Sequence, residues 1–159
     1  MRFKNLILAT FLFLGIILLS SCKEDAFKSD KELLTTGSWK ITSVIYEPPL
    51  ELSDGTLVTD VHELETECAL DNTLTFTEED TYYLSEGTVQ CAWNDQVYQT
   101  GDWRFVTENG EKSIDYDPEK DLPVRYYYKI KSITKDELVL LFKTISGNVH
   151  TMTYDNTAY

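Results

Sequence analysis

Alternation of apolar and polar residues is the feature that most restricts the fold of this chain. In the first alternating segment after Gly37, Trp39 and Ile41 fall on one side, and Lys40 and Thr42 fall on the other. A period of two is the pattern of a β-strand with one buried face. Similar segments follow at residues 56–61, 73–77, 81–87, 96–107, 113–116, 125–134, 138–145 and 149–155.

Turn residues separate these segments. Asp54-Gly55-Thr56, Glu108-Asn109-Gly110 and Ser146-Gly147-Asn148 have turn composition, and Pro48-Pro49 are expected to end the first strand, because proline cannot donate to a ladder. Apart from a short helical turn expected at 31–34, little of the chain has a helical period. The sequence predicts an all-β, antiparallel, up-and-down barrel of eight to nine strands. A two-sheet sandwich is the alternative, but only closure removes the exposed edges.

Two cysteines lie within this strand region. The midpoint between Cys68 and Cys91 falls between Glu79 and Asp80, inside a turn candidate flanked by strands. Folding the chain back there places the cysteines opposite each other at the far end of a hairpin, within disulfide range. We therefore predict a Cys68–Cys91 disulfide. Two free thiols or half of a metal site are the alternatives.

The N-terminus has the layout of an export signal. Arg2 and Lys4 precede a run of apolar or small residues at 6–19, which is shorter than the roughly 20 residues that a membrane-spanning helix needs. The run ends in Leu-Ser-Ser-Cys, which resembles the lipobox of bacterial lipoproteins. That resemblance implies cleavage of residues 1–21, attachment of diacylglycerol to the Cys22 thiol, and acylation of the new N-terminus. A plain secreted protein with an incidental cysteine is the alternative.

The segment after Cys22 is charged. Lys23-Glu24-Asp25 resembles the export tag of surface-exposed lipoproteins in Bacteroidota, and this implies an outer-membrane protein that is exposed on the cell surface. A solvated charged tether would have the same composition. We expect residues 22–32 to form a flexible acylated tether and residues 33–159 to form a single barrel domain.

Charge and composition restrict the partners. The net charge of −13 repels nucleic acids and disfavours their binding. With only His62 and His150, and without a Cys-x-x-Cys pair, no zinc site is expected. The acidic stretches 63–67 and 115–121 lack EF-hand spacing and are expected to be solvated loops. We also expect His62 to be solvated and His150 to be an ordinary strand residue. Neither histidine belongs to a recognisable nucleophile motif, so we expect no enzyme activity and no cofactor.

Aromatic residues are the best candidates for ligand contacts. Because strands alternate, Tyr127 must face away from its neighbours at 126 and 128, so that one set lines the interior. An eight-stranded barrel has room inside for side chains or for one small ligand. Packing in the core is the alternative role for these residues. The candidate ligand contacts are Trp39, Phe76, Trp103, Tyr126 and Tyr128.

Several of these features occur together in a known family. Gly37-Ser38-Trp39 resembles the Gly-x-Trp that opens lipocalins. The order of Cys68, Leu-Thr-Phe, Thr-Tyr-Tyr, Gly87, Cys91 and Gly101-Asp102-Trp103 is similar to the lipocalin-like domain of Bacteroidota lipoproteins. The chain lacks the Thr-Asp-Tyr motif of lipocalins. The resemblance implies a membrane-anchored barrel that binds a small hydrophobic or amphipathic ligand. The alternative is a filled barrel that interacts with a surface protein or glycan.

Overall fold

The computed structural model describes residues 30–91, 97–108, 110–116 and 126–157. Leu33–Tyr159 form one compact unit, and Met1–Glu32 are assigned to another. The signal segment, Cys22 and most of the expected tether lie outside the described residues, so the predictions for them stay predictions. Within the described ranges, no helix is both long and apolar enough to cross a membrane.

Strands dominate the described part of the chain. Residues 30–35 are helical, which confirms the short helical turn expected at 31–34. The strands are β1 (Trp39–Glu51), β2 (Leu57–Asp60), β3 (Thr73–Phe76), β4 (Thr81–Ser85), β5 (Val97–Glu108), β6 (Glu111–Tyr116), β7 (Tyr126–Ile133), β8 (Glu137–Lys143) and β9 (Val149–Asn156). Two short helices, η1 (Val61–Leu64) and α2 (Glu67–Leu70), lie between β2 and β3.

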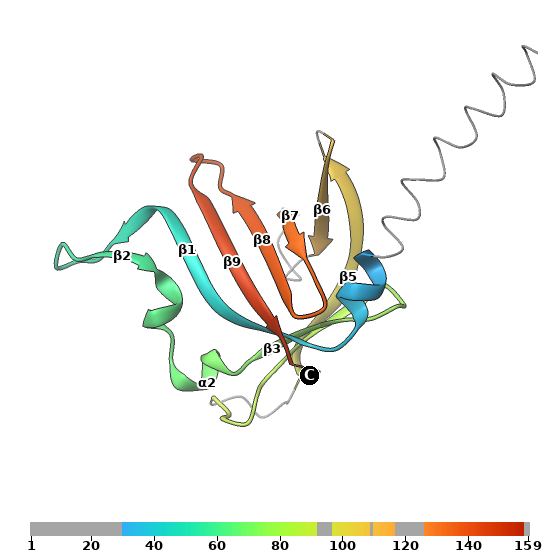
Figure 1. The fold of residues 1–159 in the computed structure, drawn as a ribbon. Coiled ribbons are helices and arrows are strands. Elements are labelled where there is room, and N and C mark those ends of the chain that lie inside the picture. The colour runs from blue at the N-terminus through green and yellow to red at the C-terminus, as the bar shows by residue number, and fades with distance from the viewer. Residues whose placement is uncertain (1–29, 92–96, 109, 117–125, 158–159) are drawn as a thin grey trace, which may run out of the picture. The chain divides into compact units, whose positions relative to one another are not determined.

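The nine strands form one antiparallel sheet that closes into a ring. From β3 to β9, each strand pairs with the next one along the chain, and β9 returns to pair with β1 (Figure 1). The closing contact runs from Trp39, opposite Asn156, to Glu47, opposite Val149. This confirms the predicted all-β up-and-down barrel. Closure gives the long strands a partner on both sides and leaves few exposed edges.

One edge of β1 is only partly paired. β9 pairs along one side of β1, whereas the other side pairs with β3 at Trp39 and Lys40 and with β2 from Ile45 onward. No strand of the described chain pairs with residues 41–44 on this second side. The ring is therefore interrupted next to the connection that carries η1 and α2.

The prediction that Pro48-Pro49 end the first strand is wrong. β1 continues to Glu51, and the register with β2 shifts between Ile45 and Leu50, across the two prolines. The register shift accommodates two residues that cannot donate to the ladder. β1 is thereby long enough to pair with β9, β3 and β2.

The interior of the ring is filled mainly by alternate apolar residues of the strands. In β3 the burial alternates as expected, with Leu74 and Phe76 buried and Thr73 and Thr75 less so. Trp39 is fully buried, and its indole Nε1 donates to the carbonyl oxygen of Leu34 at 2.8 Å. The buried cluster comprises Leu34, Trp39, Leu74, Phe76, Tyr82, Trp103, Ile114, Tyr116, Tyr128, Leu138, Leu140 and Tyr154.

Candidate functional site

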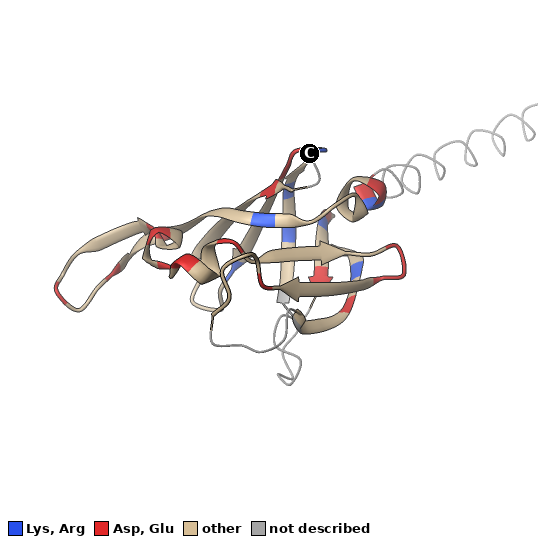
Figure 2. Ribbon diagram, turned by 90° about the horizontal axis from the view of Figure 1, so that it is seen from below, with Lys and Arg blue, Asp and Glu red and all other residues tan. Residues whose placement is uncertain are grey.

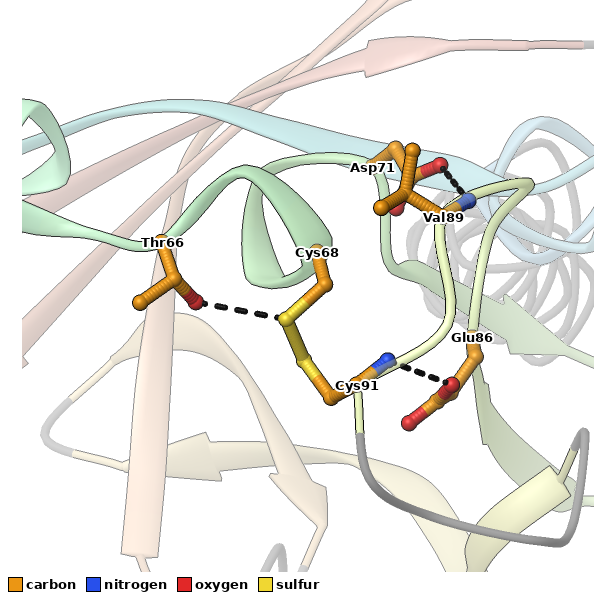
Figure 3. The surroundings of a disulfide bond; sticks show 6 residues. All are labelled: Thr66, Cys68, Asp71, Glu86, Val89 and Cys91. Atoms are coloured by element: carbon orange, nitrogen blue, oxygen red, sulfur yellow. Dashed lines mark hydrogen bonds between the residues drawn. A yellow bond between two sulfur atoms is a disulfide. The ribbon is translucent and has the colours of Figure 1, made fainter.

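The connection from β2 to β3 is fastened to the segment after β4. Cys68 in α2 and Cys91 form a disulfide with a Cα–Cα distance of 5.3 Å, which confirms the predicted bond. Close by, the backbone amide of Val89 donates to Asp71 Oδ2 at 2.9 Å (Figure 3). This bond is the largest cause that lowers the pKa of Asp71. The two connections therefore hold each other in place.

The geometry behind the disulfide differs from the predicted cross-strand pair. Strand pairing in the β3–β4 hairpin stops at Thr73 and Ser85, and the cysteines lie beyond it in a helix and in a loop. Gly87 allows these segments to approach, because a Cβ there would lie 2.4 Å from the Asp71 carbonyl oxygen. The hairpin therefore brings the two cysteine-bearing segments to the same end, as expected, and the α2 turn places Cys68 within bonding distance of Cys91.

Asp60 stabilises the unpaired edge of β1. Its Oδ1 accepts from the backbone amides of Val44 at 2.9 Å and His62 at 3.0 Å, and its Oδ2 accepts from the Ser43 hydroxyl at 2.7 Å. Burial by itself raises the pKa of Asp60, but these hydrogen bonds together outweigh it, so the pKa lies below its ordinary value. The carboxylate thus satisfies a strand amide and caps η1 at the same time.

A cavity of about 260 Å³, partly open to solvent, lies between the strands of the ring and the connection that carries η1 and α2. One part of its wall is apolar or aromatic and comes from the barrel strands. The other part comes from residues 62–73, which contribute most of the polar groups. The strand residues are Trp39, Ile41, Val44, Leu74, Leu84, Tyr116 and Tyr154. The connection contributes His62, Glu65, Ala69, Asn72 and Thr73, the last at the start of β3.

His62 is not the solvated loop residue that the sequence indicated. It lines the cavity, and its Nε2 is buried without a hydrogen-bond partner among the described residues. Sequence reasoning missed it because the acidic stretch around it was interpreted as a loop. Asp60, with Glu63 three residues later, has the spacing of a helix N-terminus and was the available signal for η1.

Two tyrosines of the cavity wall are uncharged over a wide pH range. Burial raises the pKa of Tyr154 to about 12. Burial also raises the pKa of Tyr116 well above its ordinary value, and the nearby Tyr154 and Tyr128 add to this effect. The strand side of the cavity therefore presents neutral phenols together with apolar surface.

The predicted ligand contacts are distributed between the cavity and the core. Trp39 lines the cavity. Phe76, Trp103 and Tyr128 do not line it and belong to the buried core, where Phe76 packs edge-on against Trp103 with ring centroids 5.3 Å apart. The side chain of Tyr126 lies outside the described residues. Ligand contact by any of the five residues, Trp39 included, stays a prediction.

The acidic stretches do not gather into a metal site within the described part of the chain. No group of three His, Cys, Asp or Glu side chains there is arranged to hold a metal ion. Asp115, from the second acidic stretch, is 3% exposed, and its Oδ2 accepts from Arg104 Nε at 2.8 Å. Most of that stretch, residues 117–121, lies outside the described residues.

Comparison with known proteins adds one finding. A family model described as a lipocalin-like domain matches residues 35–140, more than half of the chain. The match begins before β1 and ends within β8, so it includes the cavity wall up to Tyr116, the disulfide and the connection with η1 and α2. No curated protein matches the chain.

Proposed function

We propose that this chain, which belongs to the lipocalin-like domain family, is a non-enzymatic binding protein. Its barrel would hold a small hydrophobic or amphipathic molecule. The cavity carries this proposal, because its wall is mostly apolar with a few polar groups on one segment. That is the usual composition of a small-molecule site. Its volume of about 260 Å³ is below the roughly 300–1,000 Å³ of drug-sized pockets and indicates a small ligand.

Native mass spectrometry of the protein purified from its own host tests this proposal. A small molecule should remain bound to the parent chain. Ala69→Phe places a ring into the cavity from α2, at a position that is not itself part of the buried core, and should abolish the bound mass. Ile145→Phe, at a fully exposed residue that does not line the cavity, is the control. A parent chain that carries no molecule, or a bound mass that survives Ala69→Phe, would contradict the proposal.

We further propose that lipid on Cys22 anchors the protein to the outer membrane, with the barrel exposed on the cell surface. The basic start, the apolar run and the Leu-Ser-Ser-Cys sequence support the anchor, and Lys23-Glu24-Asp25 support the exposure. Cys22→Ala should move the protein from the membrane fraction to the soluble fraction. Retention of a lipid-modified protein in the membrane would contradict the lipobox interpretation.

A second candidate function is protein binding at the cell surface. The β1–β2 hairpin exposes one leucine on each face, Leu50 at 37% and Leu57 at 65%, because Leu50 lies opposite Val58. Exposed apolar side chains of this kind can contact a partner protein. In the same mass-spectrometry experiment, a stoichiometric protein partner without a bound small molecule would favour this function over the first.

A further inference from the structure

We propose that the cavity selects a small primary amine, held in its protonated form, with the ammonium group between His62 and Glu65 and an apolar or aromatic body against the barrel wall. This inference rests on the proposed ligand-binding function and specifies the chemistry of the ligand. It follows from the polarity of the cavity, from the charges around its polar side and from its size.

The polar side of the cavity offers hydrogen-bond acceptors. The Glu65 carboxylate can only accept when ionised. The buried Nε2 of His62 has no partner among the described residues, and it accepts in the tautomer that carries its proton on Nδ1. A buried polar atom without a partner is costly, so a ligand that supplies the missing hydrogen bond gains binding energy there. A primary ammonium has three N–H donors, which is enough for a hydrogen bond to each of these two cavity-lining residues.

The charges beside His62 favour a cation. The Asp60 carboxylate is negatively charged at neutral pH, as an aspartate with an ordinary or lowered pKa is, and it accepts from the His62 backbone amide. Glu63 in η1 and Glu67 in α2 add further acidic groups, which Figure 2 shows on the short helices beside the β1–β2 hairpin. Such a surface repels a carboxylate ligand and attracts an ammonium ligand.

The desolvation cost of the cation is limited by the position of Glu65. This residue is exposed, so the carboxylate end of the cavity is accessible to water. The ammonium group is therefore paired and partly hydrated, whereas the rest of the ligand lies against Trp39, Leu74 and Tyr154. An unpaired charge in the apolar part would be unfavourable.

The volume limits the body of the ligand. A cavity of about 150 Å³ accommodates benzene, so about 260 Å³ accommodates roughly ten non-hydrogen atoms. 2-Phenylethylamine meets this limit. 2-Phenylethanol and phenylacetate have a similar size and differ in the charge of the head group, and together the three compounds form a matched set of probes.

Isothermal titration calorimetry at pH 8, on the full chain held in amphipol, tests the inference. We expect 2-phenylethylamine to bind about fivefold more tightly than 2-phenylethanol, because a partly exposed ion pair contributes about this much affinity. Phenylacetate should bind most weakly. Glu65→Gln should remove this fivefold advantage without changing the affinity for the alcohol. Glu63→Gln removes the same charge two residues away, at a residue that does not line the cavity, and should reduce the advantage much less than Glu65→Gln does, because solvent screens its charge.

His62 is tested with a variant of similar size. His62→Phe should lower the affinity for the amine several-fold, whereas His150→Phe, at a histidine outside the cavity wall, should leave it unchanged. Unchanged far-ultraviolet circular dichroism shows that each variant is folded. If a variant is unfolded, the comparison of the three probes on the parent chain decides by itself.

The possible failures are distinguishable. Equal affinity for the three probes, or tightest binding of phenylacetate, would overturn the amine inference and leave the ligand-binding proposal intact. An equal loss in Glu63→Gln and Glu65→Gln would overturn the assignment of Glu65 as the contact. No binding of any probe, together with no co-purified molecule, would refute both the amine inference and the proposed function.

Discussion

Single side chains decide how the interruption of the ring is accommodated. Asp60 takes the place of a missing strand partner, because its carboxylate accepts from the amide of Val44 and from the hydroxyl of Ser43. An unsatisfied strand amide at a partly buried position would be unfavourable. One carboxylate thereby preserves the course of β1 and positions η1, which carries His62.

Replacement of Asp60 tests this role. Asp60→Ala removes an acceptor of three hydrogen bonds and should lower the free energy of unfolding by about 2–3 kcal/mol at pH 7. The folded pKa of Asp60 is depressed, so its contribution should be complete above about pH 5 and should diminish as the pH falls below the ordinary aspartate value of about 4. Urea unfolding from pH 3 to pH 7 measures both effects.

Asp54→Ala is the matched control for Asp60→Ala. Asp54 is exposed and accepts from the backbone amide of Thr56 in the turn between β1 and β2. We expect its replacement to lower the free energy of unfolding much less than Asp60→Ala does, because bonds at the surface compete with water. Equal losses for the two variants would show that Asp60 is an ordinary surface residue.

The buried tyrosines predict a loss of stability in alkaline solution. The folded pKa of Tyr154 is raised to about 12, so its neutral form stabilises the fold fully below the ordinary value of about 10. This contribution should be lost as the pH rises from about 10 to about 12. Tyr154→Phe should lose less stability over this window than the parent chain, as measured by urea unfolding.

Tyr83→Phe is the control, because Tyr83 is 37% exposed and lies on the face of β4 opposite to the buried Tyr82. It should reproduce the alkaline behaviour of the parent chain. A parent chain whose stability does not change between pH 10 and pH 12 would contradict the buried, neutral phenol.

The elements of the fold differ in what holds them. The long strands β1 and β9 are fixed by the ladder that closes the ring. The helices η1 and α2 contain no buried residue, so their position depends on the Asp60 cap and on the disulfide. Because this segment forms one side of the cavity, the disulfide stabilises the site as well as the fold.

Removal of the disulfide should destabilise the protein. The cysteines are separated by 23 residues, and the chain-entropy model gives about 3 kcal/mol for closing a loop of this length. The double variant Cys68→Ser with Cys91→Ser should lose this amount in urea unfolding. Addition of a reductant to the parent chain should produce the same loss and should not affect the double variant. Stability of the parent chain that is insensitive to reductant would contradict the prediction.

For the barrel as a whole, closure predicts cooperative protection of the backbone. Amides in the paired part of β1 and β9 should exchange with deuterium only through global unfolding, because their ladder is part of the ring. β2 pairs only with β1 and should exchange faster through local opening. Hydrogen exchange followed by mass spectrometry measures both. Equal protection of β2 and β9 would show that β2 is part of the cooperative ring.

The order of the strands followed from the sequence because its signals are local. Side chains alternate along any strand, and turns need residues such as Gly110 and Gly147, which adopt positive φ values here. The disulfide was predictable for a related reason, since a hairpin turn midway between Cys68 and Cys91 brings them together. The helices η1 and α2 were missed, because four residues are too few for a helical period to stand out.

The sequence by itself determined the strands, their succession and the cysteine pairing, because steric alternation and turn geometry act over a few residues. Only the tertiary structure decided that β1 has an unpaired edge, that Asp60 satisfies it and that His62 borders a cavity there. These features depend on which distant strands meet and how far each pairing extends. Such contacts join residues that no local period relates.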